Sequence, residues 1–152
     1  MNIKNILKWG AIVIVGGFLL IQLVPYGRNH TNPPVQSKPN WDSPETLALA
    51  QTACFDCHSN ETDWSRWYES IAPASWLVQA DVDEGRQHLN FSEWNQGGKP
   101  RELDHLWETT QRGSMPPLQY IILHPEAKLT PDQVSQLVAG FQATAANASA
   151  GN

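Results

Sequence analysis

The sequence predicts an all-α protein, in which one N-terminal transmembrane helix precedes a single small helical domain with long loops. Three observations predict this fold class. An uncharged apolar run lies near the N-terminus, helix-start and helix-stop signals bracket several amphipathic stretches further along, and no stretch shows sustained alternation with β-branched residues. About 110 residues, 43–152, lie beyond the N-terminal segment, which is the usual size of one domain.

The first predicted element is a membrane anchor over residues 1–26. From Trp9 to Tyr26 the chain carries no charge over 18 residues, close to the minimum length for a membrane-spanning helix. The two rings favour the membrane–water boundary, and Lys4 and Lys8 before the run favour an N-terminus on the inside. A cleaved signal peptide is the alternative, but no small-x-small cleavage site follows. We therefore expect an uncleaved single-pass anchor with the rest of the chain exported.

Two segments show neither helical nor strand periodicity. Residues 27–42 are rich in Pro, Asn and Ser and predict an extended, semi-rigid linker. Residues 144–152 are small or polar and predict a flexible tail. The predicted domain therefore spans residues 43–143.

The first half of this domain contains two predicted helices. Ser43-Pro44-Glu45 offers an N-cap, a proline at the first helical position and an acid in the first turn, for a helix that runs into Cys54–His58. A second helix is expected from about Pro73 to Gln87. Its apolar face would hold Trp76, Leu77 and Ala80.

Two further helices are predicted in the second half. One spans about Arg101 to Arg112 and stops at Gly113, with an apolar stripe of Leu103, Leu106 and Trp107. The other begins at Thr130-Pro131-Asp132-Gln133, a capping-box pattern. This last helix would bury Val134, Leu137, Val138 and Phe141.

The charge of the chain is distributed unevenly. Residues 1–40 hold four basic residues and no acid, whereas residues 41–152 hold six basic against fifteen acidic residues, a formal charge of −9. An acidic domain repels phosphate backbones, so nucleic acid is not an expected partner. The acids also keep a small exported domain soluble, and that role alone explains them.

The motif Cys54-Phe55-Asp56-Cys57-His58 carries the predicted chemistry, because CxxCH is the sequence signal of covalent c-type haem. Two thiols three positions apart can reach both vinyl groups at one porphyrin edge. The adjacent imidazole can then reach the iron as proximal ligand. An exported domain fits this interpretation, since c-type haem is attached outside the cytoplasm, and the motif uses both cysteines of the chain.

A cysteine pair of this spacing has three other known uses. A thioredoxin-like redox pair belongs beside a βαβ pattern, which this sequence lacks. A zinc site needs four N or S ligands, and a disulfide between Cys54 and Cys57 would close a loop too small to add much stability. The other histidines are scattered singly, at His30, His88, His105 and His124.

A ligand for the opposite face of the iron is expected on a downstream loop. Met115 fits, because Gly113 ends a helix and two prolines fix the backbone directly after the methionine. His/Met ligation is the pairing that raises cytochrome c potentials. Three alternatives stay open: Met115 as a core residue that fills a gap, His124 as the ligand, or an open site.

Several longer segments resemble one family. They read CFDCHSNETDW, IAPASWLVQADVDEGRQHLNFSEW and GSMPPLQYIILHPEAKLT, and a terminal helix follows. Together they resemble the haem-binding domain family of bacterial mono-haem c-type cytochromes, over nearly all of residues 44–142. The resemblance implies a small cytochrome c-like domain with one covalent haem c, thioether bonds to Cys54 and Cys57, His58 as proximal and Met115 as distal iron ligand. It leaves the role of the haem open.

Other residues are candidates to surround the haem. Aromatic side chains that could line it are Trp64, Trp67, Trp76, Trp94 and Tyr120, of which we expect about two to touch the porphyrin. Arginines that could pair with propionates are Arg66, Arg86 and Arg101, at least two of which we expect to be solvated instead. His88 and His105 are expected on the surface, and Asn90 and Ser92 in a polar loop turn.

These features predict a membrane-anchored carrier of single electrons rather than an enzyme, because an iron ligated on both faces has no open position for substrate. Its partners would be redox proteins or a membrane complex, at the bacterial cytoplasmic membrane with the domain in the periplasm or an equivalent compartment. One alternative is a haem-based sensor or peroxidase-like enzyme with an exchangeable distal site. Another is a fixed cytochrome subunit of a larger membrane complex, for which Gly16-Gly17 would allow close helix contact.

Overall fold

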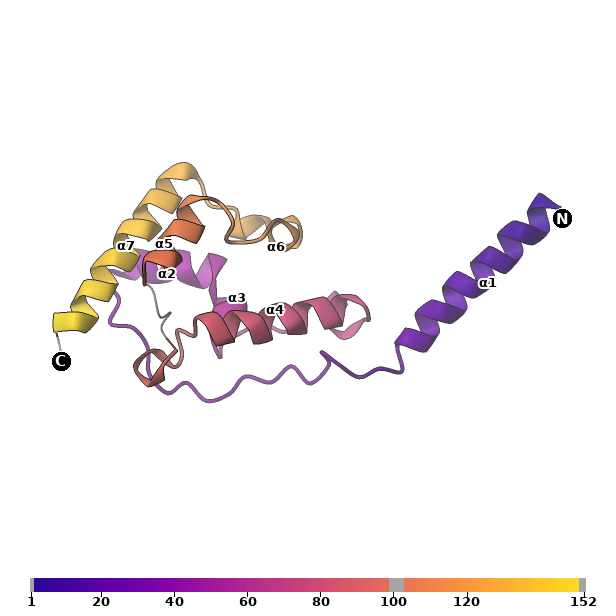
Figure 1. Cartoon of the computed structure of the whole chain (residues 1–152), viewed down its shortest axis with the longest axis horizontal. Coiled ribbons are helices and arrows are strands. Elements are labelled where there is room, and N and C mark those ends of the chain that lie inside the picture. The colour runs from indigo at the N-terminus through magenta and orange to yellow at the C-terminus, as the bar shows by residue number, and fades with distance from the viewer. Residues whose placement is uncertain (1, 99–102, 151–152) are drawn as a thin grey trace. The chain divides into compact units, whose positions relative to one another are not determined.

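The computed structural model of the chain describes residues 2–98 and 103–150. Every regular element in these residues is helical, and their single β pairing is an isolated bridge between Ser37 and Glu93 (Figure 1). The predicted all-α class is therefore confirmed. The α-helices are α1 (Ile3–Ile21), α2 (Pro44–Ala53), α3 (Phe55–His58), α4 (Ala74–His88), α5 (Leu103–Gln111), α6 (Leu118–Leu123) and α7 (Pro131–Ala150). Three 3-10 turns join them: η1 (Trp67–Ser70), η2 (Trp94–Gln96) and η3 (Pro125–Ala127).

The chain divides into two compact units, each built from two segments. Unit 1 consists of Met1–Thr31 and Asp63–Asp81, and unit 2 of Asn32–Thr62 and Val82–Asn152. Unit 1 contains α1, which is long and apolar enough to cross a membrane by length and composition. Asn2 caps its start, and it ends at Ile21, five residues before the predicted boundary at Tyr26.

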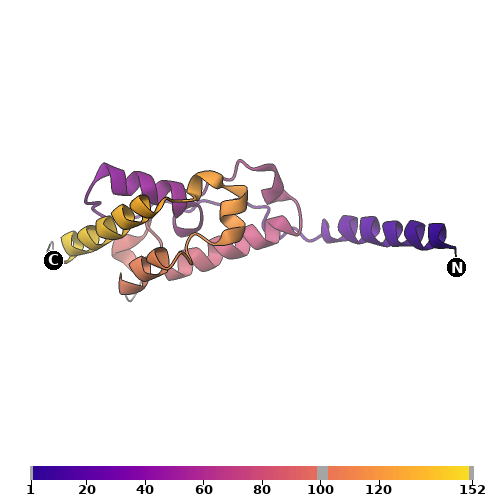
Figure 2. The ribbon, with the colours of Figure 1, turned by 90° about the horizontal axis from the view of Figure 1, so that it is seen from above.

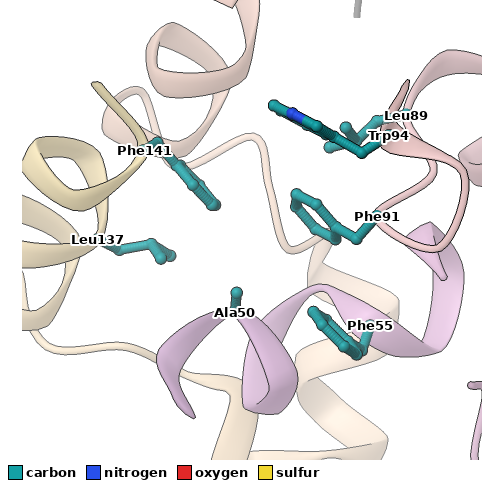
Figure 3. Packing of buried hydrophobic residues seen from close by; sticks show 7 residues of the cluster. All are labelled: Ala50, Phe55, Leu89, Phe91, Trp94, Leu137 and Phe141. Carbon is teal, nitrogen blue, oxygen red and sulfur yellow. The ribbon is translucent and has the colours of Figure 1, made fainter. Parts of the chain in front are cut away.

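The core of unit 2 is an aromatic and aliphatic cluster (Figure 3). Its buried members are Ala50, Phe55, Leu89, Phe91, Trp94, Leu137 and Phe141. Helices α2 and α7 supply one part of the cluster and the segment after α4 another. Figure 2 shows the ribbons of α2 and α7 side by side. Gly140 of α7 lies so close to Thr46 of α2 that a Cβ at residue 140 would overlap the threonine side chain. Phe91 stacks on Phe55 with ring centroids 5.5 Å apart.

The helix-start signals act as the sequence predicts. The Ser43 hydroxyl accepts a hydrogen bond from the Thr46 backbone N–H at 3.2 Å, which caps α2. Thr130 and Gln133 form the predicted capping box at α7: each side chain accepts from the backbone N–H of the other residue. The predicted helix from Arg101 is described from Leu103 onward as α5, and Arg101 lies outside the described residues. Gly113 follows α5 with a φ of +70°.

The structure differs from two predictions, the apolar face of α4 and the tail from Thr144. On α4, Leu77 and Ala80 are exposed, and the buried positions are Ser75, Val82 and Gly85. The predicted apolar face of α4 is wrong because the close contacts of this helix are made at Ser75 and Gly85, which are small residues without an apolar signal. The segment predicted as a tail from Thr144 continues α7 to Ala150.

Helix α7 remains packed just beyond the predicted domain end at residue 143. Thr144 and Ala145 are buried, and the Thr144 hydroxyl accepts a hydrogen bond from the Asp42 backbone N–H at 3.1 Å. The later part of the predicted linker is likewise fixed to unit 2. The Gln36 and Ser37 N–H groups both donate to the Ser92 carbonyl, at 2.8 and 3.0 Å. This part of the linker is extended, as predicted, but it belongs to the folded unit.

Candidate functional site

The CFDCH motif lies at a break between two helices. Cys54 has φ −129° and ψ −32°, so α2 ends there and the single turn α3 begins with Phe55. The backbone stays bonded across the break, because Cys54 N–H donates to Ala50 at 2.8 Å and His58 N–H donates to Cys54 at 2.9 Å. Residues three and four positions apart are neighbours on a turn of this kind. Cys54, Cys57 and His58 are therefore brought together, and each is half-buried.

The imidazole of His58 is held by the end of α4. Its Nδ1 lies 2.9 Å from the Gly85 carbonyl and 3.1 Å from the Leu89 carbonyl. A carbonyl only accepts hydrogen bonds, so Nδ1 carries the proton and Nε2 keeps its lone pair. The same arrangement fixes the ring of metal-binding histidines in proteins. The His58 backbone is held as well, because its carbonyl accepts from the Phe91 N–H at 2.8 Å.

Burial also determines the charge state of this imidazole. Desolvation lowers the pKa of His58 below its ordinary value of 6.5, which outweighs the opposing effect of the Leu89 and Gly85 carbonyls, and His88 lowers it further. The ring is therefore neutral at neutral pH. A neutral imidazole with a free Nε2 lone pair is the form that binds a metal.

Helix α4 approaches the motif at Gly85. A Cβ at this position would overlap the Cys57 carbonyl oxygen and would lie 3.0 Å from the Cys57 Cβ. Glycine is therefore required for the close contact that brings the Gly85 carbonyl to the His58 ring.

A buried polar network behind the motif was only partly anticipated from the sequence. The Asn60 N–H donates to the Ser92 hydroxyl, the Asn90 amide donates to the Asn60 side-chain oxygen, and the Ser92 N–H donates to the Asn90 side chain, each at 2.9 Å. All three residues are buried. Asn90 and Ser92 were predicted to lie in a polar loop turn. Asn60 carries no separate signal in the sequence, apart from lying two residues after the motif.

Arg86 fixes the chain that leaves the motif. Its Nε donates to the Ser59 carbonyl at 2.8 Å, and its Nη2 donates to Asn32 at 3.0 Å and to the Thr62 hydroxyl at 3.1 Å. The guanidinium thus holds the loop that follows His58, a role that the sequence did not predict for this candidate propionate partner.

The two cysteines are free thiols. Burial raises the pKa of the Cys54 thiol to about 12, and the neighbouring Cys57 adds to the rise. A redox-active CxxC nucleophile has a lowered thiol pKa, so this environment does not favour a thioredoxin-like function. Across the described residues, no three His, Cys, Asp or Glu side chains are grouped to hold a metal ion, and the zinc alternative gains no support there.

Met115 lies on the loop between α5 and α6, with 43% of its surface exposed. The Ser114 and Met115 N–H groups both donate to the Thr109 carbonyl, at 3.1 and 3.3 Å. None of the contacts described for Met115 joins it to Cys54, Cys57 or His58. The segment that follows it does reach the motif, since the Tyr120 hydroxyl donates to the Asp56 carboxylate at 2.7 Å.

His124, the other candidate for the distal position, is buried against Tyr120. The two rings are stacked with centroids 3.9 Å apart and an interplanar angle of 12°. Its Nδ1 lies 3.0 Å from the Tyr120 carbonyl, which makes Nδ1 the donor. His124 therefore supports Tyr120 in the structure.

The remaining candidates fall into several groups. Tyr120 reaches the motif through Asp56, whereas Trp94 is part of the core cluster. Trp64, Trp67, Trp76 and Arg66 belong to unit 1. His88 and His105 are exposed, as predicted. Arg101 lies outside the described residues.

A model of the haem-binding domain family matches residues 16–143. No curated protein and no solved structure matches the chain significantly.

Proposed function

The chain belongs to the haem-binding domain family, and from that premise we propose that it carries one covalent haem c and passes single electrons on the exported side of a membrane. The observation that carries the proposal is the His58 ring, which is neutral and bonded through Nδ1 to two carbonyls beside two free thiols on the same turn. This chemistry suits a porphyrin iron better than a redox dithiol.

The residues of the motif fit the group. Cys54 and Cys57 would each bond through sulfur to one vinyl carbon, an addition in which the thiol hydrogen is retained by the product. His58 Nε2 would be the proximal ligand. Two buried donors of unit 2, the indole Nε1 atoms of Trp41 and Trp94, have no hydrogen-bond partner among the described residues. A buried donor of this kind is costly unless a bound acceptor or water satisfies it, and a propionate is such an acceptor.

Met115 is the proposed distal ligand, on the strength of its position before two prolines on a loop whose next helix is hydrogen-bonded to Asp56. When bound, the haem supplies one-electron redox chemistry. The chain would contribute a fixed imidazole from His58 and a thioether sulfur from Met115. Helix α1 would keep the domain close to membrane redox partners and raise their effective concentration.

A specific observation favours a second candidate, a haem-based sensor or peroxidase-like enzyme. Met115 is 43% exposed, and its backbone N–H donates to the Thr109 carbonyl of the preceding helix, not to the motif. A ligand held in this way could be displaced by a small molecule. A further interpretation of the same site is that the chain is a fixed cytochrome subunit of a larger membrane complex.

The test is to express the full chain with haem-attachment machinery and to measure its mass and its pyridine haemochrome spectrum. We expect one haem that resists acid–acetone extraction. In Cys54→Ala and in Cys57→Ala, the pyridine haemochrome spectrum should indicate one thioether bond instead of two. A colourless protein, or haem lost to extraction, would overturn the proposal.

The distal position is tested by absorption spectroscopy on the same protein. A weak methionine-to-iron charge-transfer band that disappears in Met115→Ala supports the carrier. High-spin ferric features in the unmodified protein would favour the sensor or enzyme. Co-purification with other membrane proteins after mild detergent extraction separates a complex subunit from a free carrier.

A further inference from the structure

The C-terminal end of α1 is bound to the segment that starts α4, within unit 1. The Gln22 side chain donates to the Ala72 carbonyl at 2.9 Å and accepts from the Ala72 N–H at 3.0 Å. The same amide donates to the Phe18 carbonyl at 3.1 Å and accepts from Arg28 at 3.0 Å. Because Ala72 is fully buried, this pairing is part of the interior of the unit.

The residues after Gln22 continue the attachment. Gly27 has a φ of +77°, and a Cβ there would overlap the Ser75 carbonyl, so only glycine allows this approach. His30 stacks on Trp64 with ring centroids 4.8 Å apart and planes 5° from parallel. Its Nε2 also lies 3.1 Å from the Glu69 carbonyl. The stretch from Gln22 to His30 is therefore bound to the 63–81 segment at several points.

The length of α1 determines the depth at which this attachment occurs. At about 1.5 Å per residue, the 19 residues of α1 span about the thickness of a bilayer hydrocarbon core. If α1 crosses the membrane with the side chains of Lys4 and Lys8 extended to the inner headgroups, the rest of the helix is needed to span the core, and Gln22 lies close to the boundary with the outer headgroups. Ala72, within hydrogen-bond distance of Gln22, then lies at the same depth.

Large apolar side chains are exposed in this part of unit 1. Trp67 is 78% exposed, Leu77 67% and Tyr26 46%. Trp67 and Leu77 lie on either side of Ala72 in the sequence. Tryptophan and tyrosine favour the membrane–water interface. The exported part of unit 1 holds two basic and three acidic residues, so it is nearly neutral, in contrast to the acidic remainder of the chain.

We propose that the exported part of unit 1 is a membrane-facing platform, in which the Gln22–Ala72 pairing holds the 63–81 segment in the lipid headgroup layer and Trp67 inserts there. The proposal rests on α1 being the membrane anchor proposed above. It assigns the 63–81 segment to lipid contact rather than to haem binding. Residues 22–30 thus connect the anchor to the 63–81 segment through packed contacts.

The experiment measures the depth of an environment-sensitive thiol probe in the full-length haem protein, reconstituted in phosphatidylcholine–phosphatidylglycerol nanodiscs. The probe is attached to Trp67→Cys, to Val13→Cys within α1, or to Gln142→Cys, an exposed position of α7 in unit 2. Wild-type protein, treated in parallel, corrects for the two native cysteines. Quenching is expressed as the ratio with and without nitroxide lipid, which cancels quenching by the haem.

We expect the probe at residue 67 to be quenched most by a headgroup nitroxide and that at residue 13 most by a nitroxide deep in the acyl chain. The probe at residue 142 should respond to neither. Gln22→Ala should reduce quenching at residue 67 and leave residue 13 unchanged, whereas Gln36→Ala, an exposed glutamine of unit 2, should change neither. Deep quenching at residue 13 without quenching at residue 67 would overturn the platform alone. Absence of quenching at residue 13 would instead overturn the anchor.

Discussion

A hydrogen bond between Tyr120 and Asp56 connects the methionine-bearing segment to the CxxCH motif. A hydrogen bond from a hydroxyl to a carboxylate at 2.7 Å is of the stronger, charge-assisted kind. We predict that Tyr120→Phe lowers the free energy of unfolding by about 1–2 kcal/mol, since such bonds contribute about 1.5–3 kcal/mol and this one is partly exposed. Urea unfolding measures the loss. The methionine-to-iron band should weaken in the same variant.

A double-mutant cycle controls for the phenyl ring itself. Asp56→Ala removes the acceptor, and the double variant measures the coupling energy between the two side chains. A coupling energy near zero would mean that Tyr120 stabilises α6 without holding it to the motif. Stacking of His124 on Tyr120 is unaffected by either substitution, because neither one removes a ring.

The protonation of His58 gives a second prediction at this scale, for the haem-free chain in detergent. Burial lowers the folded-state pKa of His58 below 6.5. Below that pH the unfolded chain takes up a proton that the folded chain does not bind, so the free energy of unfolding falls as pH decreases through 6.5 and levels off below the folded pKa. Above pH 6.5 His58 contributes no such dependence.

Denaturant titrations on both sides of pH 6.5 measure this effect. His58→Gln should flatten the decrease, whereas His105→Gln, which replaces a histidine exposed on α5, should retain it. An unchanged slope in His58→Gln would contradict the buried, neutral state of the ring.

Single residues show where sequence reasoning reaches its limit. The proximity of Cys54, Cys57 and His58 could be predicted because it follows from spacing within one short segment. The partners of the His58 ring could not, since the Gly85 and Leu89 carbonyls lie about 30 residues away and carry no side-chain signal. The partners of Asn60 and Arg86 could not be predicted either, because both side chains are hydrogen-bonded to other loops.

At the scale of elements, the contact between α4 and the attachment turn depends on Gly85. In an exposed helix, replacing glycine by alanine stabilises by about 1 kcal/mol. Here the added Cβ overlaps the Cys57 carbonyl, and overpacking of this kind costs about 1–3 kcal/mol. We predict that Gly85→Ala lowers the thermal stability and the yield of haem protein, as measured by calorimetry and by absorbance per mole of chain.

Gln87→Ala is the matched control, at an exposed position two residues further along α4. It changes helix propensity without adding an atom to the contact and should be neutral or slightly stabilising. A Gly85→Ala protein that is more stable than wild type would contradict the close approach of the two elements.

Helix boundaries were predictable where capping residues mark them and not where packing determines them. Ser43 and the Thr130–Gln133 pair cap their helices as expected. The composition of residues 144–152 indicated a tail, yet the small side chains there allow α7 to pack, which buries Thr144. A Pro-rich segment lacks regular structure, but its composition does not show whether its backbone N–H groups pair elsewhere, as those of Gln36 and Ser37 do.

For the whole molecule, the division into two units separates the proposed chemistry from the anchor. Cys54, Cys57, His58 and Met115 all belong to unit 2. The 63–81 segment belongs instead with the N-terminal 31 residues, although it connects two segments of unit 2 in sequence. The predicted boundaries, with the anchor ending at residue 26 and the domain starting at residue 43, place the 63–81 segment in the domain. They do so because they assume that neighbours in sequence fold together.

This division predicts that the starting residue of a truncated chain determines whether the 63–81 segment is structurally ordered. A chain exported through a cleavable signal peptide and starting at Gln22 keeps the Gln22–Ala72 pairing, the contact of Gly27 with Ser75 and the stacking of His30 on Trp64. A chain starting at Asn32 loses all three. We expect both proteins to retain haem, and the shorter one to be cleaved much faster within 63–81 in limited proteolysis mapped by mass spectrometry. Equal cleavage of the two would mean that the 63–81 segment is held without the N-terminal residues, so that the anchor and the domain are connected by a linker alone.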